Sequence, residues 1–182
     1  TPPVAKNFVI TMLEDSAATG TNGLVDFSSY ISDVDNSHGQ SQSLTVKLVS
    51  NPNPSTRGSL VTYSGSTPVS IGSLSTQQLR FLLATPRSGY GNVTFTYQVT
   101  DNTNQGNDLS NIATVTVVII HVNHAPILSI PNTKYSEKVS GSTDPTIAGT
   151  ITDYDYTTDT VNLYIIASNL TSFKVAADNT AQ

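Results

Sequence analysis

YGNVTFTYQVTD, residues 90–101, is the stretch that decides the fold of this chain. Large apolar residues alternate in it with threonine and glutamine, and the apolar ones are Val93, Phe95, Tyr97 and Val99. A two-residue period puts the apolar side chains on one face of an extended strand and the polar ones on the other. We therefore predict a half-buried strand of an antiparallel sheet, closed by the acidic turn Asp101-Asn102.

A second alternating stretch, rich in β-branched residues, follows at residues 111–122 and is the expected partner of the first. Upstream, shorter stretches of the same kind are separated by turn residues, at 7–13, 24–31, 44–49 and 58–64. Residues 76–84 could form a helical turn, but Pro86 and the β-rich context favour a loop that leads into a short strand. About seven short strands with this spacing predict an all-β, Greek-key β-sandwich.

The composition narrows the class of protein. Charged residues make up only 12% of the 182 residues, so serine, threonine, asparagine and glutamine supply most of the polarity. The net charge of −5, without a lysine or arginine cluster, argues against nucleic acid and anionic membrane surfaces. No apolar run approaches the roughly 18–20 residues that span a bilayer. We expect a stable β protein located outside the cell or on its surface.

The chain contains no cysteine. Disulfides, thiol catalysis and cysteine-ligated zinc are therefore excluded.

The pattern of the first residues begins again after residue 122, which indicates an internal repeat. Pro3-Val4 recurs as Pro126-Ile127, and Asp33-Val34-Asp35 recurs as Asp153-Tyr154-Asp155. The two recurrences lie 123 and 120 positions apart. A sequence that repeats itself at a nearly constant spacing is typical of tandem modules, each a separate folding unit.

These recurrences set the expected domain boundaries. Residues 1–122 form one complete sandwich, 123–126 a proline-containing linker, and 127–182 the N-terminal half of a second, like repeat. The second copy stops near the equivalent of Ser64 and lacks the later strands, so its core and a sheet edge would be exposed. We therefore expect an incomplete second repeat, in a protein that continues past Gln182.

Taken together, these features resemble the tandem cadherin-like and bacterial immunoglobulin-like repeats of large surface adhesins. One part of the resemblance lies in the stretch that ends at Asp101, and the matching residues there are Pro86, Tyr90, Gly91, Val93, Phe95, Tyr97, Val99 and Asp101. The phrase leading into the linker carries it at Ala113, Val115, Val117, Val122, Asn123 and Pro126. The resemblance implies a structural, rod-forming role and calcium at the domain junctions. This sequence departs from the family pattern at two places. His124 stands where the family has a calcium-ligating aspartate, and Arg87-Ser88 stands where animal cadherins have an acidic doublet.

Calcium takes about six to eight oxygen ligands, mostly carboxylates and carbonyls. By resemblance, one ligand set lies at the N-terminal pole of the first sandwich and consists of Asp33, Asp35 and Asp101. By resemblance too, a second set lies at the junction between the copies and consists of Glu14, Asn123, Asp153 and Asp155. The alternative is that these residues only stabilise turns.

Other constellations give no convincing catalytic or metal site. His121 and His124 are three positions apart, and an extended chain points such residues to opposite faces, so they are poor zinc ligands. Ser37 and His38 beside Asp35 do not form a hydrolytic trio, because residues adjacent in a loop seldom reach the required geometry. We expect no enzymatic activity.

Two N-glycosylation sequons are present, at Asn92-Val93-Thr94 and Asn169-Leu170-Thr171. Asn92, which we expect in a turn, is the better acceptor if the protein is secreted by a eukaryote. The other match, at Asn53, is blocked by the proline that follows it.

The leading hypothesis is a structural repeat module of an extracellular adhesin, filament or surface-layer protein. Its expected partners are neighbouring like repeats of the same chain, with self-assembly into a fibre or a cell-surface or glycan ligand as further options. The alternative is a carbohydrate- or protein-binding domain that uses the polar loops at residues 32–42 and 85–91. An enzyme is the weakest hypothesis, since the chain offers no converging catalytic groups.

Overall fold

A computed structural model describes residues 1–17, 22–39, 42–65, 67–84, 89–101, 108–130 and 149–153. The chain divides into two compact units, unit 1 at Thr1–Val122 and unit 2 at Asn123–Gln182. Apart from one short helix, the regular elements of the described part are all strands, as the sequence predicts. No helix among the described residues has the length and apolar character to cross a membrane.

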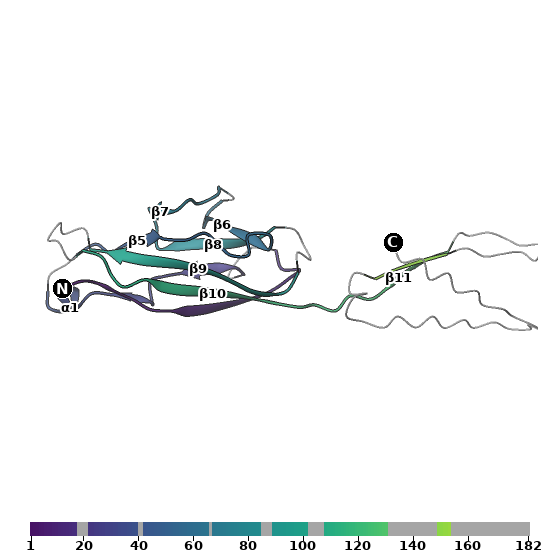
Figure 1. The fold of residues 1–182 in the computed structure, drawn as a ribbon, viewed down its shortest axis with the longest axis horizontal. Coiled ribbons are helices and arrows are strands. Elements are labelled where there is room, and N and C mark those ends of the chain that lie inside the picture. Colours follow the sequence, from purple (N-terminus) through teal and green to yellow (C-terminus); the bar gives the residue numbers. More distant parts are fainter. Residues whose placement is uncertain are drawn as a thin grey trace, which may run out of the picture. The chain divides into compact units, whose positions relative to one another are not determined.

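The larger sheet of unit 1 has five strands (Figure 1). Its order is β2 (Phe8–Leu13), β10 (Ala113–Ile120), β9 (Gly91–Thr100), β5 (Thr45–Leu48) and β7 (Gly72–Ser73). All neighbours are antiparallel except β2 and β10, which run parallel.

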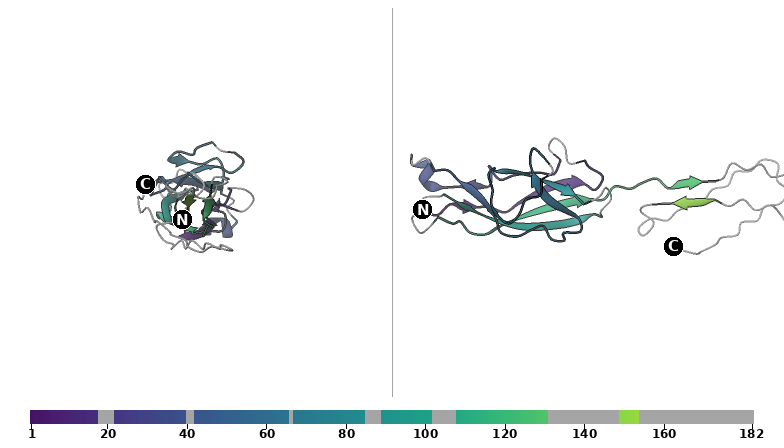
Figure 2. Two further views of the ribbon diagram at one scale, coloured as in Figure 1. Left: turned by 90° about the vertical axis from the view of Figure 1, so that its right-hand side faces the viewer. Right: turned by 90° about the horizontal axis from the view of Figure 1, so that it is seen from above.

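The opposing layer is a three-stranded antiparallel sheet, seen from further sides in Figure 2. Its order is β3 (Leu24–Asp26), β8 (Gln78–Leu83) and β6 (Gly58–Thr62). Beside these layers, β1 (Val4–Ala5) pairs with β4 (Ile31–Ser32), and the helix α1 (Val34–Ser37) follows β4. In unit 2, β11 (Ile127–Ser129) pairs antiparallel with β12 (Thr150–Thr152).

The core of unit 1 lies between the two sheets and confirms the alternation predicted for residues 90–101. Tyr97, Val93, Phe95 and Val99 on β9 are each at most 1% exposed, whereas the alternate residues of the strand reach solvent. The opposing sheet contributes Val25, Leu79 and Phe81, which belong to the same apolar cluster. Burial of one such side chain contributes about 1.5–3 kcal/mol. These contacts join the two sheets through one apolar cluster.

Two of the predicted strands differ in detail from those observed. The stretch 24–31 is interrupted, because the main-chain N–H of Tyr30 donates a hydrogen bond to the carbonyl of Phe27 in a turn that separates β3 from β4. The ambiguous stretch 76–84 is a strand, β8, whose partners lie on both sides. Most of the strands expected in residues 127–182 fall outside the described residues.

The chain enters unit 1 at one end and leaves it at the other. Because β2 and β10 are parallel, the start of β2 lies beside the start of β10, and Leu13 lies beside Ile120 where both strands end. We call the end with Thr1 and α1 the entry pole and the end with Ile120 the exit pole; Figure 1 shows the N-terminus at the entry pole.

Candidate functional site

Asp33 is positioned at the entry pole by its local structure. It is the N-cap of α1, in extended conformation, and its Oδ1 accepts a hydrogen bond of 2.8 Å from the main-chain N–H of Asp35. Such caps satisfy an N–H that the first turn of a helix leaves unpaired. The cap fixes one carboxylate oxygen and leaves the other for a different partner.

That second oxygen, Oδ2 of Asp33, is buried and has no hydrogen-bond partner, and the residue is only 7% exposed. Leaving a buried acceptor unpaired costs about 1–3 kcal/mol, and more for a charged group. Proteins seldom retain such an atom without a partner such as a water molecule or an ion. Oδ2 of Asp33 therefore indicates a binding position at the entry pole.

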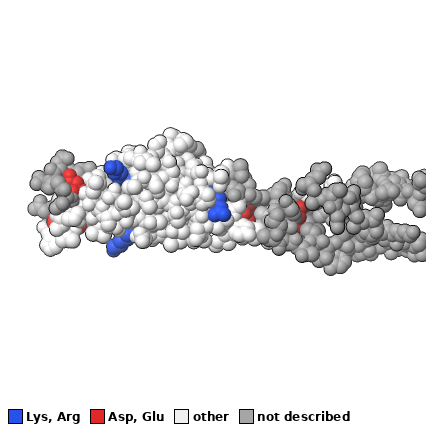
Figure 3. Space-filling model, viewed as in Figure 1, with Lys and Arg blue, Asp and Glu red and all other residues white. Residues whose placement is uncertain are grey.

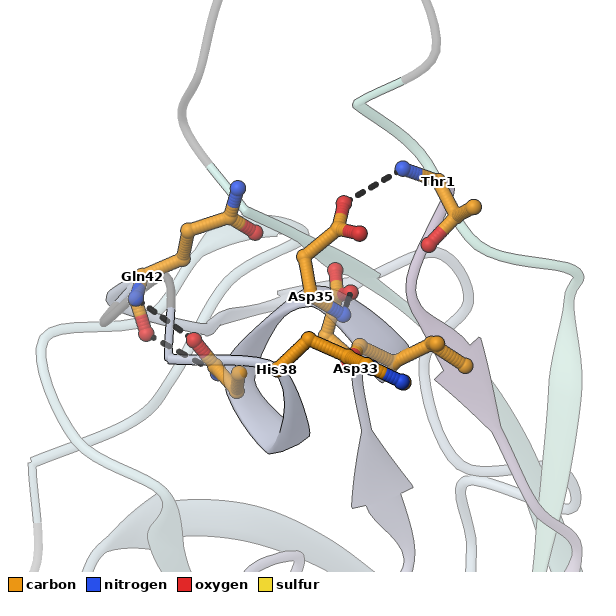
Figure 4. Close-up of polar contacts among 7 residues, drawn as sticks. Thr1, Asp33, Asp35, His38 and Gln42 are labelled. Atoms are coloured by element: carbon orange, nitrogen blue, oxygen red, sulfur yellow. Dashed lines mark hydrogen bonds and ion pairs between the residues drawn. The ribbon is translucent and has the colours of Figure 1, made fainter.

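Two further carboxylates, those of Asp35 and Asp101, belong to the same pole. Asp35 accepts a hydrogen bond of 2.5 Å from the amino group of Thr1, and Figure 4 shows these two residues directed toward one another above Asp33. Asp101, at the end of β9, is 5% exposed. Because β9 runs antiparallel to β10, the end of β9 with Asp101 lies at the entry pole as well.

The three carboxylates share a pole but do not form a ready-made metal centre. Among the residues that the structure describes, no three aspartate, glutamate, histidine or cysteine side chains are arranged to hold a metal ion. The calcium site predicted from Asp33, Asp35 and Asp101 therefore stays a prediction, supported by the unpaired Oδ2. On the face drawn in Figure 3, acidic side chains of unit 1 lie at its ends.

At the exit pole, Glu14 is buried, with 3% exposure, and its Oε1 accepts two hydrogen bonds. Nδ1 of His121 lies 2.6 Å from this oxygen, and the main-chain N–H of Val122 lies 2.7 Å from it. The His121 ring also packs on Tyr90, with 4.7 Å between ring centroids. Nothing in the sequence signalled the contact between Glu14 and His121, because the two residues are 107 positions apart.

The other members of the predicted junction set are placed as follows. Asn123 is exposed in unit 2, Asp153 follows β12 in the same unit, and Asp155 lies outside the described residues. This second calcium set stays a prediction.

The predicted glycosylation sites have different outcomes. Asn92 is exposed, but it is the second residue of β9 and not part of a turn, and its carbonyl accepts a hydrogen bond of 3.0 Å from Arg57. The expectation of a turn was wrong, because β10 continues to pair with β9 as far as Gly91. Asn169 lies outside the described residues.

The comparisons with known proteins yield little. No protein-family model matches the chain, and no curated protein matches it. Among solved structures, it is similar to the crystal structure of human CDH23 EC21-23, with 16% identity and a TM-score of 0.39. The match covers 81% of this chain, which spans about half (49%) of that chain. An identity and a TM-score this low add no argument to the geometry described above.

Proposed function

We propose that unit 1 is a structural spacer module of an extracellular protein, joined in series to modules of like build. The observation that carries this proposal is the parallel pairing of β2 with β10, the first and last long strands of the unit. An antiparallel pair would bring the entering and leaving chain to the same end. A parallel pair puts them at opposite ends, so that each module in a series adds its own length.

The same pairing suits the module to bearing tension. A pull on the entering and the leaving chain draws β2 and β10 in opposite directions along their shared edge. Their hydrogen bonds, over the six residues paired from Phe8 to Leu13, are then loaded together and not one after another. Simultaneous loading gives resistance that sequential opening lacks.

Calcium at the entry pole is the second part of the proposal. Asp33, Asp35 and Asp101 would hold the ion, whose charge would offset that of the three carboxylates and give Oδ2 of Asp33 a partner. The ion would tie α1 to the segment where the chain enters. We do not extend this proposal to Glu14, because its Oε1 already accepts two hydrogen bonds.

A single-molecule pulling experiment tests the structural role. Because the chain has no cysteine, the variants Thr1→Cys and Val122→Cys combined provide handles at the two poles. The matched control carries Lys6→Cys and Ile112→Cys, whose handles lie at the same ends of β2 and β10 and therefore open the pair one bond at a time. We expect a several-fold higher rupture force for the pole-to-pole geometry. Equal forces in the two geometries would refute the load-bearing role.

The recognition hypothesis receives no support from the placement of its loops. The described part of the 32–42 loop contains α1 at the entry pole, whereas Tyr90 lies at the exit pole against His121. Residues 40–41 and 85–88 of these loops lie outside the described residues, so the recognition hypothesis stays a prediction.

A further inference from the structure

In the described part of unit 1, most edges of the two main sheets are short or covered. At the far edge of the larger sheet, β7 has only two residues, and at one edge of the smaller sheet β3 has three. The other edge of the smaller sheet, β6, is covered by the bridge between Val61 and Pro68 and by the bond from Val69 to Leu60. β2, with six residues, has no strand on its outer side in the described part of the chain. A long open edge is a template for pairing with another chain.

One hydrogen bond shows which residues of β2 direct their main-chain groups to the open side. The N–H of Glu14 donates to Ile120 on β10, so the even-numbered residues of β2 direct their main-chain groups toward β10. Backbone groups alternate in direction along a strand, so Val9, Thr11 and Leu13 direct theirs to the open side. The side chains of these three residues are exposed, with Val9 at 60% and Leu13 at 47%.

We propose that a second copy of this chain pairs antiparallel with β2, about a two-fold axis that passes beside Thr11. In this register, Val9 lies opposite Leu13 of the second copy, and Thr11 lies opposite Thr11. These pairs place apolar beside apolar and hydroxyl beside hydroxyl. The carbonyl of Leu13 already accepts a hydrogen bond of 3.0 Å from the N–H of Ser16, so each pair of Val9 with Leu13 is joined by the bond from the Leu13 N–H to the Val9 carbonyl, and the Thr11 pair by both of its bonds. The result is one continuous sheet across both copies.

The charges that flank β2 select the antiparallel direction. β2 itself has no charged residue, but Lys6 precedes it and Asp15 follows it, and both are exposed. Antiparallel pairing places Lys6 of each copy at the same end of the shared sheet as Asp15 of the other, so that opposite charges share each end. A parallel pair would instead place lysine beside lysine and aspartate beside aspartate, which is unfavourable across strands.

The neighbouring strand extends the contact on the solvent face. Ile120 lies beside Leu13 and is 44% exposed, and Val118 lies beside Thr11. In the proposed register, Ile120 and Leu13 of one copy form a row with Val9 of the other. This association is lateral and does not depend on the serial role proposed above, so either can fail alone.

Cross-linking of the whole chain tests the register, because the only thiols present are those introduced. Val9→Cys and Leu13→Cys are made separately and oxidised alone and as a mixture. The proposed register puts a disulfide within reach only between unlike variants, since Cα atoms of a hydrogen-bonded pair are about 5.5 Å apart. We expect the mixture to give at least ten times more covalent dimer than either variant alone. A mixture of Val9→Cys with Thr94→Cys, from the exposed face of β9, is the control.

Two results overturn the proposal. One is a mixture of Val9→Cys and Leu13→Cys that gives no more dimer than the control mixture or than either variant alone. The other is a light-scattering mass that stays at the 19.3 kDa of one chain up to about 1 mM protein. As a second measurement, Thr11→Lys and Thr11→Glu should each be monomeric, because like charges would meet at the axis. Their mixture should regain the dimer mass, and a mixture that stays monomeric also counts against the register.

Discussion

The phenol of Tyr97 donates a hydrogen bond of 2.7 Å to the main-chain carbonyl of Lys6, 91 positions earlier. Lys6 lies where the chain leaves β1 and enters β2, between strands that belong to different sheets. A second carbonyl, that of Tyr30, lies 3.3 Å from the same hydroxyl. The buried Tyr97 of β9 thus fixes the segment that links the β1–β4 pair to the larger sheet.

The first prediction concerns this hydrogen bond. In Tyr97→Phe, the ring still fills the core, but the carbonyl of Lys6 loses its donor. We expect the free energy of unfolding to fall by about 0.5–1.5 kcal/mol, the usual net contribution of one hydrogen bond, because this bond is only partly buried. Chemical denaturation of both proteins measures it. Tyr63→Phe, at an exposed ring, is the control and should change stability little. Equal losses in the two variants would contradict the role of the hydroxyl.

The second prediction is an alkaline limit to stability. Burial is the main cause that raises the pKa of Tyr97 from 10.0 to about 12, against the lowering effect of its bond to Lys6. Between these values, the unfolded chain has lost the phenol proton while the folded chain retains it. Stability contributed by the neutral phenol is complete below pH 10 and falls as the pH rises toward about 12.

Melting temperatures measured from pH 9 to pH 12 test this prediction. The wild type should lose more stability over this range than Tyr97→Phe, which has no phenol to ionise at this position. Identical slopes for the two proteins would show that Tyr97 does not set the limit.

Part of this architecture follows from the sequence. The alternation on β9 and β10 predicted two half-buried strands because the side-chain period of a strand is independent of the rest of the fold. The contact of Glu14 with His121 was not predictable, because it joins residues that only the parallel pairing of β2 with β10 brings together. The unpaired oxygen of Asp33 was also not predictable, since it depends on α1, a single turn that the sequence presents as loop.

The third prediction concerns Asp33. Asp33→Asn keeps the oxygen that caps α1 and removes the charge whose Oδ2 has no partner. In chelator, we expect this variant to be as stable as the wild type or up to about 1 kcal/mol more stable. Asp26→Asn is the matched control, because both oxygens of Asp26 accept hydrogen bonds, from Ser28 and Gln78. It should be destabilised.

Calcium should reverse the order of stability, so that the wild type becomes more stable than Asp33→Asn. A ligand that binds only the folded state at a hundredfold excess over Kd adds about 2.7 kcal/mol. The wild type should gain a stabilisation of this size that Asp33→Asn lacks, as measured by calorimetric melting with calcium and with chelator. A wild type that melts at the same temperature in both conditions would remove calcium from the proposal and leave the spacer role in place.

The last prediction concerns Glu14, whose Oε1 holds the exit pole together. Glu14→Gln keeps an oxygen that can accept from the N–H of Val122, whereas Glu14→Leu removes the acceptor altogether. We expect Glu14→Leu to lose about 2–4 kcal/mol, because two hydrogen bonds disappear, and Glu14→Gln to lose about half as much. The loss should be local as well as global, since Val122 is the last residue of unit 1. Amide exchange at Val122 should accelerate far more in Glu14→Leu than exchange on β9. A uniform acceleration would mean that Glu14 supports the whole sandwich and not its exit pole.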